Sequence, residues 1–393
     1  MKTLICFLFS FCYLALASTT NRPCGSNYSN IWLELIFVVD NSQGMGSTQL
    51  GAISAAIETI LDGMQIGIQD DNPRTTRVGI ITYSRNATII AHLDTFHSFL
   101  DFLNKWATYS PEVSPVDESN MSTGLELSEK VFEDGKRYDR STVRKIVVVF
   151  ASAYNAEGEF DPVPIANRLK SNGVSIVAVG ISPVKNIQLL HDLSQVASPG
   201  FVVENSFDSY FYTQIQTAFL QTNSFCPNGW TQYREEYGDN GSKKYGSCLK
   251  AVAKWTNWMG ARTVCHAIWP NGFLVNEFSQ QKHDYVLTVV RNTNTFSRPY
   301  KYHIGLSSNN GNWYWDQPTG SDPIPLASTP YSNWNPDFPI LDSSKQSVIN
   351  NESASSGTVS TSWQKIDKSD EGLFFVCEVD VCDTDNYCDY IGD

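Results

Sequence analysis

Nine cysteines are the residues of this chain whose chemistry the sequence predicts most directly. Two of them, Cys6 and Cys12, lie in an apolar stretch at the start of the chain. The other seven are Cys24, Cys226, Cys248, Cys265, Cys377, Cys382 and Cys388. In an oxidising compartment most of these seven should form disulfides. Because seven is an odd number, we expect at least one cysteine to stay outside the internal pairs or to bond to another chain.

The first residues predict that the chain is exported. Lys2 precedes an apolar run from Leu4 to Leu16, and Ala15-Leu16-Ala17 provides the small residues of a cleavage site. This is the pattern of a secretory signal peptide, here residues 1–18, and Cys6 and Cys12 would leave with it. The run is shorter than the roughly 20 residues that a membrane-spanning helix needs. We therefore expect a secreted, extracellular protein without a membrane span.

A secreted surface is also the place where Asn-x-Ser/Thr sequons can carry glycans. The sequence holds five such sequons, at Asn27, Asn86, Asn120, Asn240 and Asn351. Each of them is a candidate glycosylation site.

The net charge and the motifs of the sequence argue against several classes of function. The net charge of −13 argues against nucleic acid as a partner, because phosphate binding needs clustered lysine and arginine. It also argues against a polybasic membrane-surface role. The six histidines are scattered, and neither G-x-S-x-G nor H-E-x-x-H occurs. The sequence therefore predicts a protein that is not an enzyme.

The amino-acid composition of the chain changes at Cys226, which predicts a domain boundary. Eight of the ten tryptophans and six of the nine cysteines fall at or after this residue. We expect an N-terminal segment at 19–33, a first domain at 34–222, a second domain at 226–379 and an acidic, cysteine-containing tail at 380–393.

Before the boundary, apolar strands alternate with amphipathic helices. Leu33–Asp40, Lys145–Phe150 and Ser175–Gly180 are short apolar runs typical of strands buried on both faces. Helical spacing follows the first run at Leu50, Ile53, Ile57 and Ile60, and a later helix is expected to bury Phe96, Leu100 and Leu103. This alternation predicts an α/β domain with a doubly wound, mostly parallel sheet.

The loop Asp40–Gly46 follows the first strand and therefore lies at the edge where such sheets bind ligands. Gly44-Met45-Gly46 could be taken for part of a dinucleotide-binding motif, but the third glycine would fall at Gln49. We do not predict a dinucleotide site.

From Glu34 to Thr222, the order of elements and the loop Asp40-Asn41-Ser42 resemble a von Willebrand factor A domain. The resemblance implies a Mg²⁺ site made by an Asp-x-Ser-x-Ser loop, a threonine on a second loop and an aspartate after the fourth strand. Asp40 and Ser42 match this pattern, but Gly44, Met121 and Ala151-Ser152-Ala153 do not. Asp40 and Ser42 are thus candidate ligands of a degenerate site, and Asp40 could equally serve only as a loop and helix-cap residue.

After the boundary, six ordered motifs resemble a long-form C-type lectin-like domain, an α+β fold. They are Cys226-Pro227-Asn228-Gly229-Trp230 with Ser247-Cys248, Trp258–Cys265, Tyr302–Leu306, Trp313–Asp316, Tyr331–Trp334 and Phe374–Glu378. The resemblance implies the disulfides Cys226–Cys248 and Cys265–Cys377. We expect Cys382 and Cys388 to form a third bridge, which leaves Cys24 as a candidate for a disulfide to a partner chain.

The family's sugar-binding Ca²⁺ site is altered in this sequence. Phe338-Pro339-Ile340 and Trp363-Gln364-Lys365 stand where the resemblance places the two ligand triplets, and the ammonium group of Lys365 would repel the ion. Ligand contacts are therefore expected from the long loop, at about residues 307–366, with Tyr331, Trp334 and Asp337 as candidates. We predict no cofactor, with Ca²⁺ or Mg²⁺ as the open alternative.

An exported A domain followed by a C-type lectin-like domain resembles a group of secreted nematode lectin-like proteins. The resemblance implies extracellular recognition of a glycan or protein ligand, often in innate defence. The alternative is a metal-dependent adhesion protein that uses the edge at Asp40.

Overall fold

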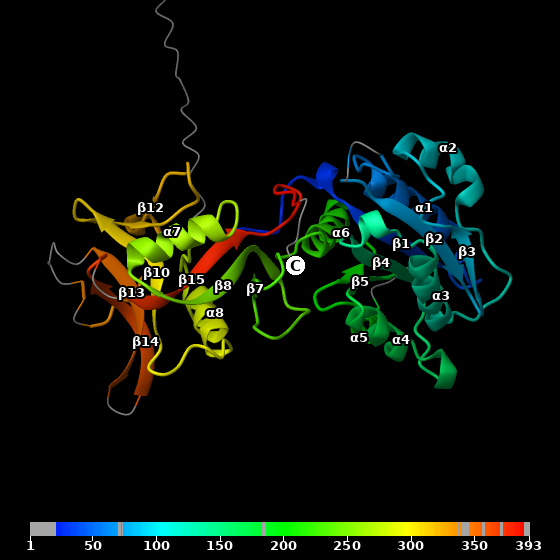
Figure 1. Ribbon diagram of the computed structural model, residues 1–393. Coiled ribbons are helices and arrows are strands. Elements are labelled where there is room, and N and C mark those ends of the chain that lie inside the picture. Colours follow the sequence, from blue (N-terminus) through cyan, green and yellow to red (C-terminus); the bar gives the residue numbers. More distant parts are fainter. Residues whose placement is uncertain are drawn as a thin grey trace, which may run out of the picture. The chain divides into compact units, whose positions relative to one another are not determined.

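The computed structural model describes residues 21–69, 72, 74–182, 186–336, 338–339, 346–355, 358–369 and 372–388. These residues form two compact units (Figure 1). The larger unit combines Pro23–Lys250 with Val379–Asp393, and the smaller unit contains Ala251–Glu378. The chain thus passes from one unit to the other within strands β8 (Lys244–Thr256) and β15 (Leu373–Asp380). The domain boundary at residue 226 remains a sequence-based prediction, since a compact unit need not coincide with a domain.

The core of the larger unit is a six-stranded sheet with strand order β3-β2-β1-β4-β5-β6. All neighbouring pairs are parallel except β2 and β3, which are antiparallel. The strands are β1 (Leu33–Asp40), β2 (Arg77–Tyr83), β3 (Ala87–Ala91), β4 (Arg144–Ala151), β5 (Val174–Gly180) and β6 (Val202–Glu204). The predicted doubly wound α/β architecture is therefore confirmed.

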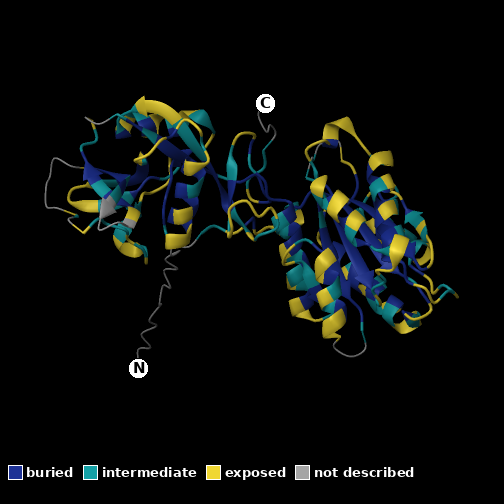
Figure 2. Ribbon diagram, turned by 90° about the horizontal axis from the view of Figure 1, so that it is seen from below, coloured by how far each residue is buried: buried dark blue, intermediate teal, exposed yellow. Residues whose placement is uncertain are grey.

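Helices cover both faces of this sheet because its central strands are apolar on both sides (Figures 1 and 2). In β1, Leu35 and Phe37 pack into one core, whereas Ile36 and Val38 pack into the other. The first core is closed by α1 (Gly46–Leu61), α2 (Phe99–Tyr109) and α6 (Ser209–Thr222). The second is closed by α3 (Met121–Asp134), α4 (Val163–Ser171) and α5 (Ile187–Val196).

Helix α2 buries a different face from the predicted one. The side chain of Ser98 accepts a hydrogen bond from the backbone N–H of Asp101, so the helix begins at Phe99. Its buried residues are Phe102 and Trp106, while Leu100 is 66% exposed. Phe96 is buried but precedes the helix, which is why extending the helical spacing from Phe96 selected the wrong residues.

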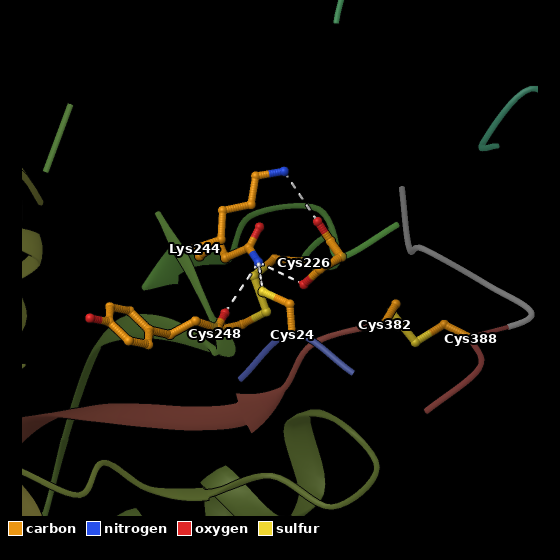
Figure 3. The surroundings of a disulfide bond; sticks show 9 residues. Cys24, Cys226, Lys244, Cys248, Cys382 and Cys388 are labelled. Carbon is orange, nitrogen blue, oxygen red and sulfur yellow. Dashed lines mark hydrogen bonds between the residues drawn. A yellow bond between two sulfur atoms is a disulfide. The ribbon is translucent and has the colours of Figure 1, made fainter. Parts of the chain in front are cut away.

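The larger unit also contains the hairpin of β7 (Thr231–Arg234) and the first half of β8, together with the C-terminal tail. Disulfides join Cys226 to Cys248 and Cys382 to Cys388, as the sequence predicted (Figure 3). Cys24 lies outside these bridges and is buried, with the side-chain amide of Gln232 3.8 Å from its sulfur. Burial of Cys24 argues against the predicted disulfide to a partner chain, because a bridging thiol must be accessible.

The smaller unit is an α+β fold in which β10 is paired with β11, β13 and β15, and β9 pairs with β15. Its elements after β8 are α7 (Trp258–Ile268), β9 (Phe273–Leu274), α8 (Gln280–Arg291), β10 (Lys301–Asn309), β11 (Asn312–Trp315), β12 (Ile324–Pro325), β13 (Ser347–Ser355), β14 (Thr358–Ile366) and β15. The remaining predicted disulfide, Cys265–Cys377, ties α7 to β15.

Short 3-10 helices complete the described structure, at Tyr28–Asn30, Tyr138–Arg140, Gly158–Phe160 and Leu326–Ser328. Within the described ranges, no helix has both the length and the apolar character needed to cross a membrane.

Candidate functional site

The edge at Asp40 is built by the carboxyl ends of the central parallel strands. Asp40 is the last residue of β1 and stands opposite Tyr83, the last residue of β2. Ser152 follows β4 directly, and the loop before α3 brings Ser119 to the same place. Parallel strands end at a common edge, so residues far apart in the sequence converge on Asp40.

The carboxylate of Asp40 is fully buried and accepts several hydrogen bonds. Its Oδ1 atom accepts the backbone N–H of Ser42 at 2.9 Å. Its Oδ2 atom accepts the hydroxyl of Ser119 at 2.8 Å, the backbone N–H of Ser152 at 3.1 Å and the hydroxyl of Ser152. These donors stabilise the negative charge of the buried carboxylate, as a bound cation would otherwise do. Burial raises the pKa of the nearby Tyr83 phenol, and the charge of Asp40 raises it further.

The structure corrects one residue of the predicted ligand pattern. Met121, expected at the position of the ligand threonine, is fully buried and packs into the core beneath α3. The hydroxyl group at this edge comes instead from Ser119, two residues earlier. The sequence analysis placed Met121 at this position and therefore missed Ser119, which forms no recognisable pattern with Asp40 in the sequence.

The residues at this edge fit a resident divalent cation poorly. Asp40 is their single buried carboxylate, and both serine hydroxyls are already directed at it. A second carboxylate, Asp117, is exposed. Its Oδ1 atom lies near Gly44, 3.4 Å from the position that a Cβ atom on residue 44 would occupy. Among the described residues, no group of three or more histidine, cysteine or acidic side chains could hold a metal. Mg²⁺ is usually held by carboxylates that remain open to it.

Replacing Asp40 by asparagine should destabilise the larger unit. The amide NH₂ group cannot accept the donors that converge on Oδ2, and leaving buried donors unsatisfied costs about 2 kcal/mol or more. Urea denaturation measures this loss, and Asp117→Asn is the matched control, with no expected change. If Mg²⁺ raises the melting temperature of the unmodified protein and Asp40→Asn removes the increase, the cation-dependent alternative is correct instead.

The smaller unit brings the long-loop aromatic residues together. We call Trp313, Tyr331 and Trp334 the aromatic face, because all three are partly exposed. Trp334 packs edge-on against Trp313 with ring centroids 5.2 Å apart, and against the fully buried Trp363 at 5.6 Å. Tyr331 packs edge-on against Trp363 at 5.5 Å. Asp337, the third predicted ligand-binding residue, lies outside the described residues.

A lysine amino group lies beside this face. Lys365 is buried, and its Nζ atom sits 5.4 Å from the centre of the Trp313 ring. A cation placed over an aromatic ring is attracted by the negative ring face. The same positive charge should oppose Ca²⁺ binding at this position, and the loss of the Ca²⁺ site stays a prediction.

A buried polar network supports the aromatic face from beneath. The carboxylate of Glu277 is fully buried and accepts hydrogen bonds from Trp363 Nε1 at 2.8 Å and from Asn350 Nδ2 at 2.8 Å. His283 Nδ1 lies 2.9 Å from the same carboxylate, and Asn333 of the long loop lies 3.2 Å from His283 Nε2. The network thus links helix α8 to the loop and fixes the orientation of Trp363.

The charges within the network stabilise each other. Burial alone would raise the pKa of Glu277, but the charge and hydrogen bond of His283 hold that pKa below its ordinary value. Burial alone would lower the pKa of His283, but Glu277 raises it above its ordinary value. The pair is therefore an ion pair over the pH range between these pKa values.

The five sequons differ in exposure. Asn27, Asn86 and Asn240 are exposed. Asn120 is buried, and its side-chain amide donates to the carbonyl of Arg85. Asn351 is half-buried and donates to Gln364. Glycosylation at all five remains a prediction, and accessibility favours the first three.

Comparison with known proteins supports the resemblance of the first part of the chain. Residues 34–217 match the family of the von Willebrand factor type A domain. The C-type lectin domain-containing protein 160 of Caenorhabditis elegans is 26% identical over 380 residues, which cover 93% of this chain and 56% of that protein. This chain therefore spans a little over half the length of that relative. A mouse protein with sushi, von Willebrand factor type A, EGF and pentraxin domains is 26% identical over 41% of this chain and 4% of its own length.

Solved structures resemble the two parts only distantly. Proximal thread matrix protein 1 from the mussel byssus, with a zinc-occupied MIDAS motif, has a TM-score of 0.40 at 20% identity and covers 49% of this chain and 46% of its own. Human lithostathine has a TM-score of 0.29 at 22% identity and covers 39% of this chain and 99% of its own. Scores this low carry no conclusion about the function of this chain.

Proposed function

We propose that this chain is a secreted, non-enzymatic recognition protein whose C-type lectin-like domain binds a glycan or protein ligand without the family's Ca²⁺ site. Innate defence is the proposed setting, by analogy with the secreted nematode proteins that the sequence resembles. The relatives support the non-enzymatic class, since they are von Willebrand factor A and lectin-domain proteins by name.

The assignment of a C-type lectin-like domain is supported by disulfides and topology. Cys226–Cys248 closes the opening hairpin, and Cys265–Cys377 joins the first helix of the smaller unit to its last strand. The chain between Cys248 and Cys377 forms helices α7 and α8 and the sheet from which the long-loop residues project. The three disulfides also support an oxidising, extracellular location.

The aromatic face is the observation that carries the proposal. Aromatic side chains stack on the apolar faces of sugars and are enriched at protein interfaces, because they offer a large contact area at a low cost in conformational entropy. Trp334 is held by Trp313 and Trp363, and Tyr331 is held by Trp363, so the exposed parts of Trp334 and Tyr331 remain for a ligand. The hydroxyl of Tyr331 donates to Gln280 Oε1 at 3.1 Å and can still accept a hydrogen bond from a ligand without any metal.

The von Willebrand factor A domain has a separate role in this proposal. We assign to it either contact with a protein or the function of a spacer, since Asp40 is already satisfied by serine hydroxyls and backbone N–H groups. Recognition by the smaller unit then does not require a cation at the Asp40 edge.

Truncating two residues of the aromatic face should strongly weaken ligand binding. For the mature protein on a glycan array, we expect Tyr331→Ala with Trp334→Ala to weaken binding roughly 30-fold or more, because truncating an aromatic anchor costs about 2 kcal/mol or more. The matched control is Trp255→Ala, which removes an exposed tryptophan of β8 in the same unit. Unchanged binding in the double variant, or equal loss in the control, would contradict the proposal.

A further inference from the structure

A second site lies in the larger unit, at the opposite end of the sheet from Asp40. It is a cavity of about 500 Å³, which we call the basic pocket, lined by four basic residues: Arg144, Lys170, Arg234 and Lys244. Arg144 is the first residue of β4, and Lys170 stands in the last turn of α4. Arg234 ends β7, and Lys244 begins β8. Two regions of the chain that are distant in sequence thus place four cations around one space.

No negative charge balances these cations within the lining. Among the described residues that line the pocket, none is aspartate or glutamate. The polar lining consists of neutral groups, including Ser171, Ser175, Ser198, Ser224 and Ser242. This composition is unusual for a chain with a net charge of −13, in which acidic side chains outnumber basic ones.

The cations are held in place by neutral acceptors. Lys244 Nζ donates to the backbone carbonyls of Gln221 at 3.1 Å and Ser224 at 3.4 Å, and Figure 3 shows its extended side chain. Lys170 Nζ lies near the backbone carbonyls of residues 195 and 197, and the Arg144 guanidinium lies 4.6 Å from the centre of the Phe225 ring. In the described part of the chain, Arg144, Lys170 and Lys244 form no ion pair with a carboxylate.

Burial and mutual repulsion disfavour the charged forms of these basic groups. Burial lowers the pKa of Lys244 to about 8. The charges of Arg234 and Arg144 lower this pKa further, and the nearby Cys24 raises it. Burial likewise lowers the pKa of Lys170 and of Arg144 below their ordinary values. An anion in the pocket would relieve this unfavourable charge, because it supplies a negative charge beside Arg144, Lys170 and Lys244.

We propose that the basic pocket binds a doubly charged oxyanion of the sulfate or phosphate class, either as the free ion or as an ester on a sugar. A tetrahedral oxyanion offers several acceptor oxygens, which suits lysine ammonium groups, arginine guanidinium groups and serine hydroxyls arranged around it. The cavity is larger than one such ion, so it can also admit the sugar that carries an ester. This site is independent of the ligand proposed for the smaller unit.

One sequon lies at the rim of this pocket. Asn240 is exposed, lines the cavity and accepts a hydrogen bond from Arg234 at its backbone carbonyl. A glycan on its side chain would restrict access. The test therefore uses the mature protein after enzymatic removal of N-linked glycans.

Titration with inorganic sulfate, against sodium chloride at equal ionic strength, tests the proposal. Isothermal calorimetry should show saturable binding, which Lys244→Gln and, separately, Lys170→Gln weaken about tenfold or more, since hydrogen bonds to charged groups are the strong ones. Lys243→Gln is the matched control, because Lys243 is the exposed neighbour of Lys244 and its amino group lies over the Tyr245 ring. It should leave sulfate affinity within about twofold, as expected of a surface charge.

Proton uptake provides a readout that a purely structural role would not change. Bound sulfate should raise the pKa of Lys244, so binding at pH 8 should take up protons, and affinity should fall as the pH rises above about 8. Calorimetry in buffers of different ionisation enthalpy measures this uptake, which Lys244→Gln should abolish. Absence of saturable sulfate binding, or equal weakening by Lys243→Gln, would overturn the proposal.

Comparing probes assigns the source of the oxyanion. Tighter binding of a sulfated or phosphorylated monosaccharide than of the inorganic ion identifies a sugar ester as the ligand. Equal affinities identify the free ion. If Lys244→Gln fails to fold, Lys170→Gln keeps the test intact, because Lys170 stands on a different element.

Discussion

Replacing Cys265 and Cys377 together by serine should lower the free energy of unfolding of the smaller unit by about 5 kcal/mol, on the chain-entropy account of a disulfide. The bridge joins residues that are 112 positions apart, and its loss frees nearly the whole unit in the unfolded state. Because compact domains are stabilised by only about 5–15 kcal/mol in total, this change should leave the unit marginally folded. Urea denaturation of the purified variant measures the effect.

The third bridge provides an internal control for this prediction. Cys382 and Cys388 are 6 positions apart, so replacing both by serine should cost only about 2 kcal/mol on the same account. The first double variant should therefore lose roughly twice as much stability as the second. Equal losses would show that local strain, and not loop length, determines what these disulfides contribute.

The second large effect is expected at the buried network of the smaller unit. Glu277→Gln removes the negative charge while keeping the side-chain shape, so His283, Trp363 and Asn350 lose a charged acceptor. Breaking a buried ion pair by removing one partner costs about 3–5 kcal/mol. Chemical denaturation at pH 6 measures this cost, and ligand binding should decline with it, because Trp363 supports the aromatic face.

The ion pair also predicts how stability depends on pH. His283 has a folded-state pKa above its ordinary value of 6.5, so its contribution is complete below 6.5 and is lost as the pH rises through the folded pKa. Glu277 has a folded-state pKa below its ordinary value of 4.5, so its contribution is complete above 4.5 and is lost as the pH falls through the folded pKa. The pair should therefore stabilise most between pH 4.5 and 6.5.

A neighbouring carboxylate serves as the control. Asp284 is exposed on the same helix, next to His283, and Asp284→Asn should change stability far less than Glu277→Gln. The loss of stability above pH 6.5 should persist in Asp284→Asn and disappear in Glu277→Gln. A wild-type protein whose smaller unit is equally stable at pH 6 and pH 9 would contradict the account of the network.

Local patterns were sufficient to predict most of the first domain. The run Leu33–Asp40 is apolar at every position except Glu34 and Asp40, which is why it can fill two cores, with Leu35 and Phe37 on one side and Ile36 and Val38 on the other. Helix α4 was missed because its nine residues begin beside prolines and bury only Ala166 and Leu169. So short an apolar stripe gives little helical signal.

The functional sites were less predictable because they are assembled from distant segments. Ser119 and Ser152 meet on Asp40 only because strand ends converge, and neither residue forms a recognisable pattern with Asp40 in the sequence. The resemblance to C-type lectin-like domains pointed to Tyr331 and Trp334, but it gave no indication of Glu277, which lies more than 50 residues before them.

The basic pocket was also not predictable from the sequence, because folding brings its charges together. Arg144, Lys170, Arg234 and Lys244 are separated by up to 100 residues, so the sequence does not show that these four cations come together. Folding concentrates these four cations around one cavity. Net charge argued against a polyanionic surface partner such as nucleic acid, and it carries no information about a local pocket.

The most direct test of the central proposal compares the mature protein in EDTA, Ca²⁺ and Mg²⁺. Melting temperature and glycan-array binding should be the same in all three conditions, because Lys365 stands beside the aromatic face and Asp40 is satisfied by protein donors. A higher melting temperature or newly acquired binding in Ca²⁺ or Mg²⁺ would contradict metal-independent recognition.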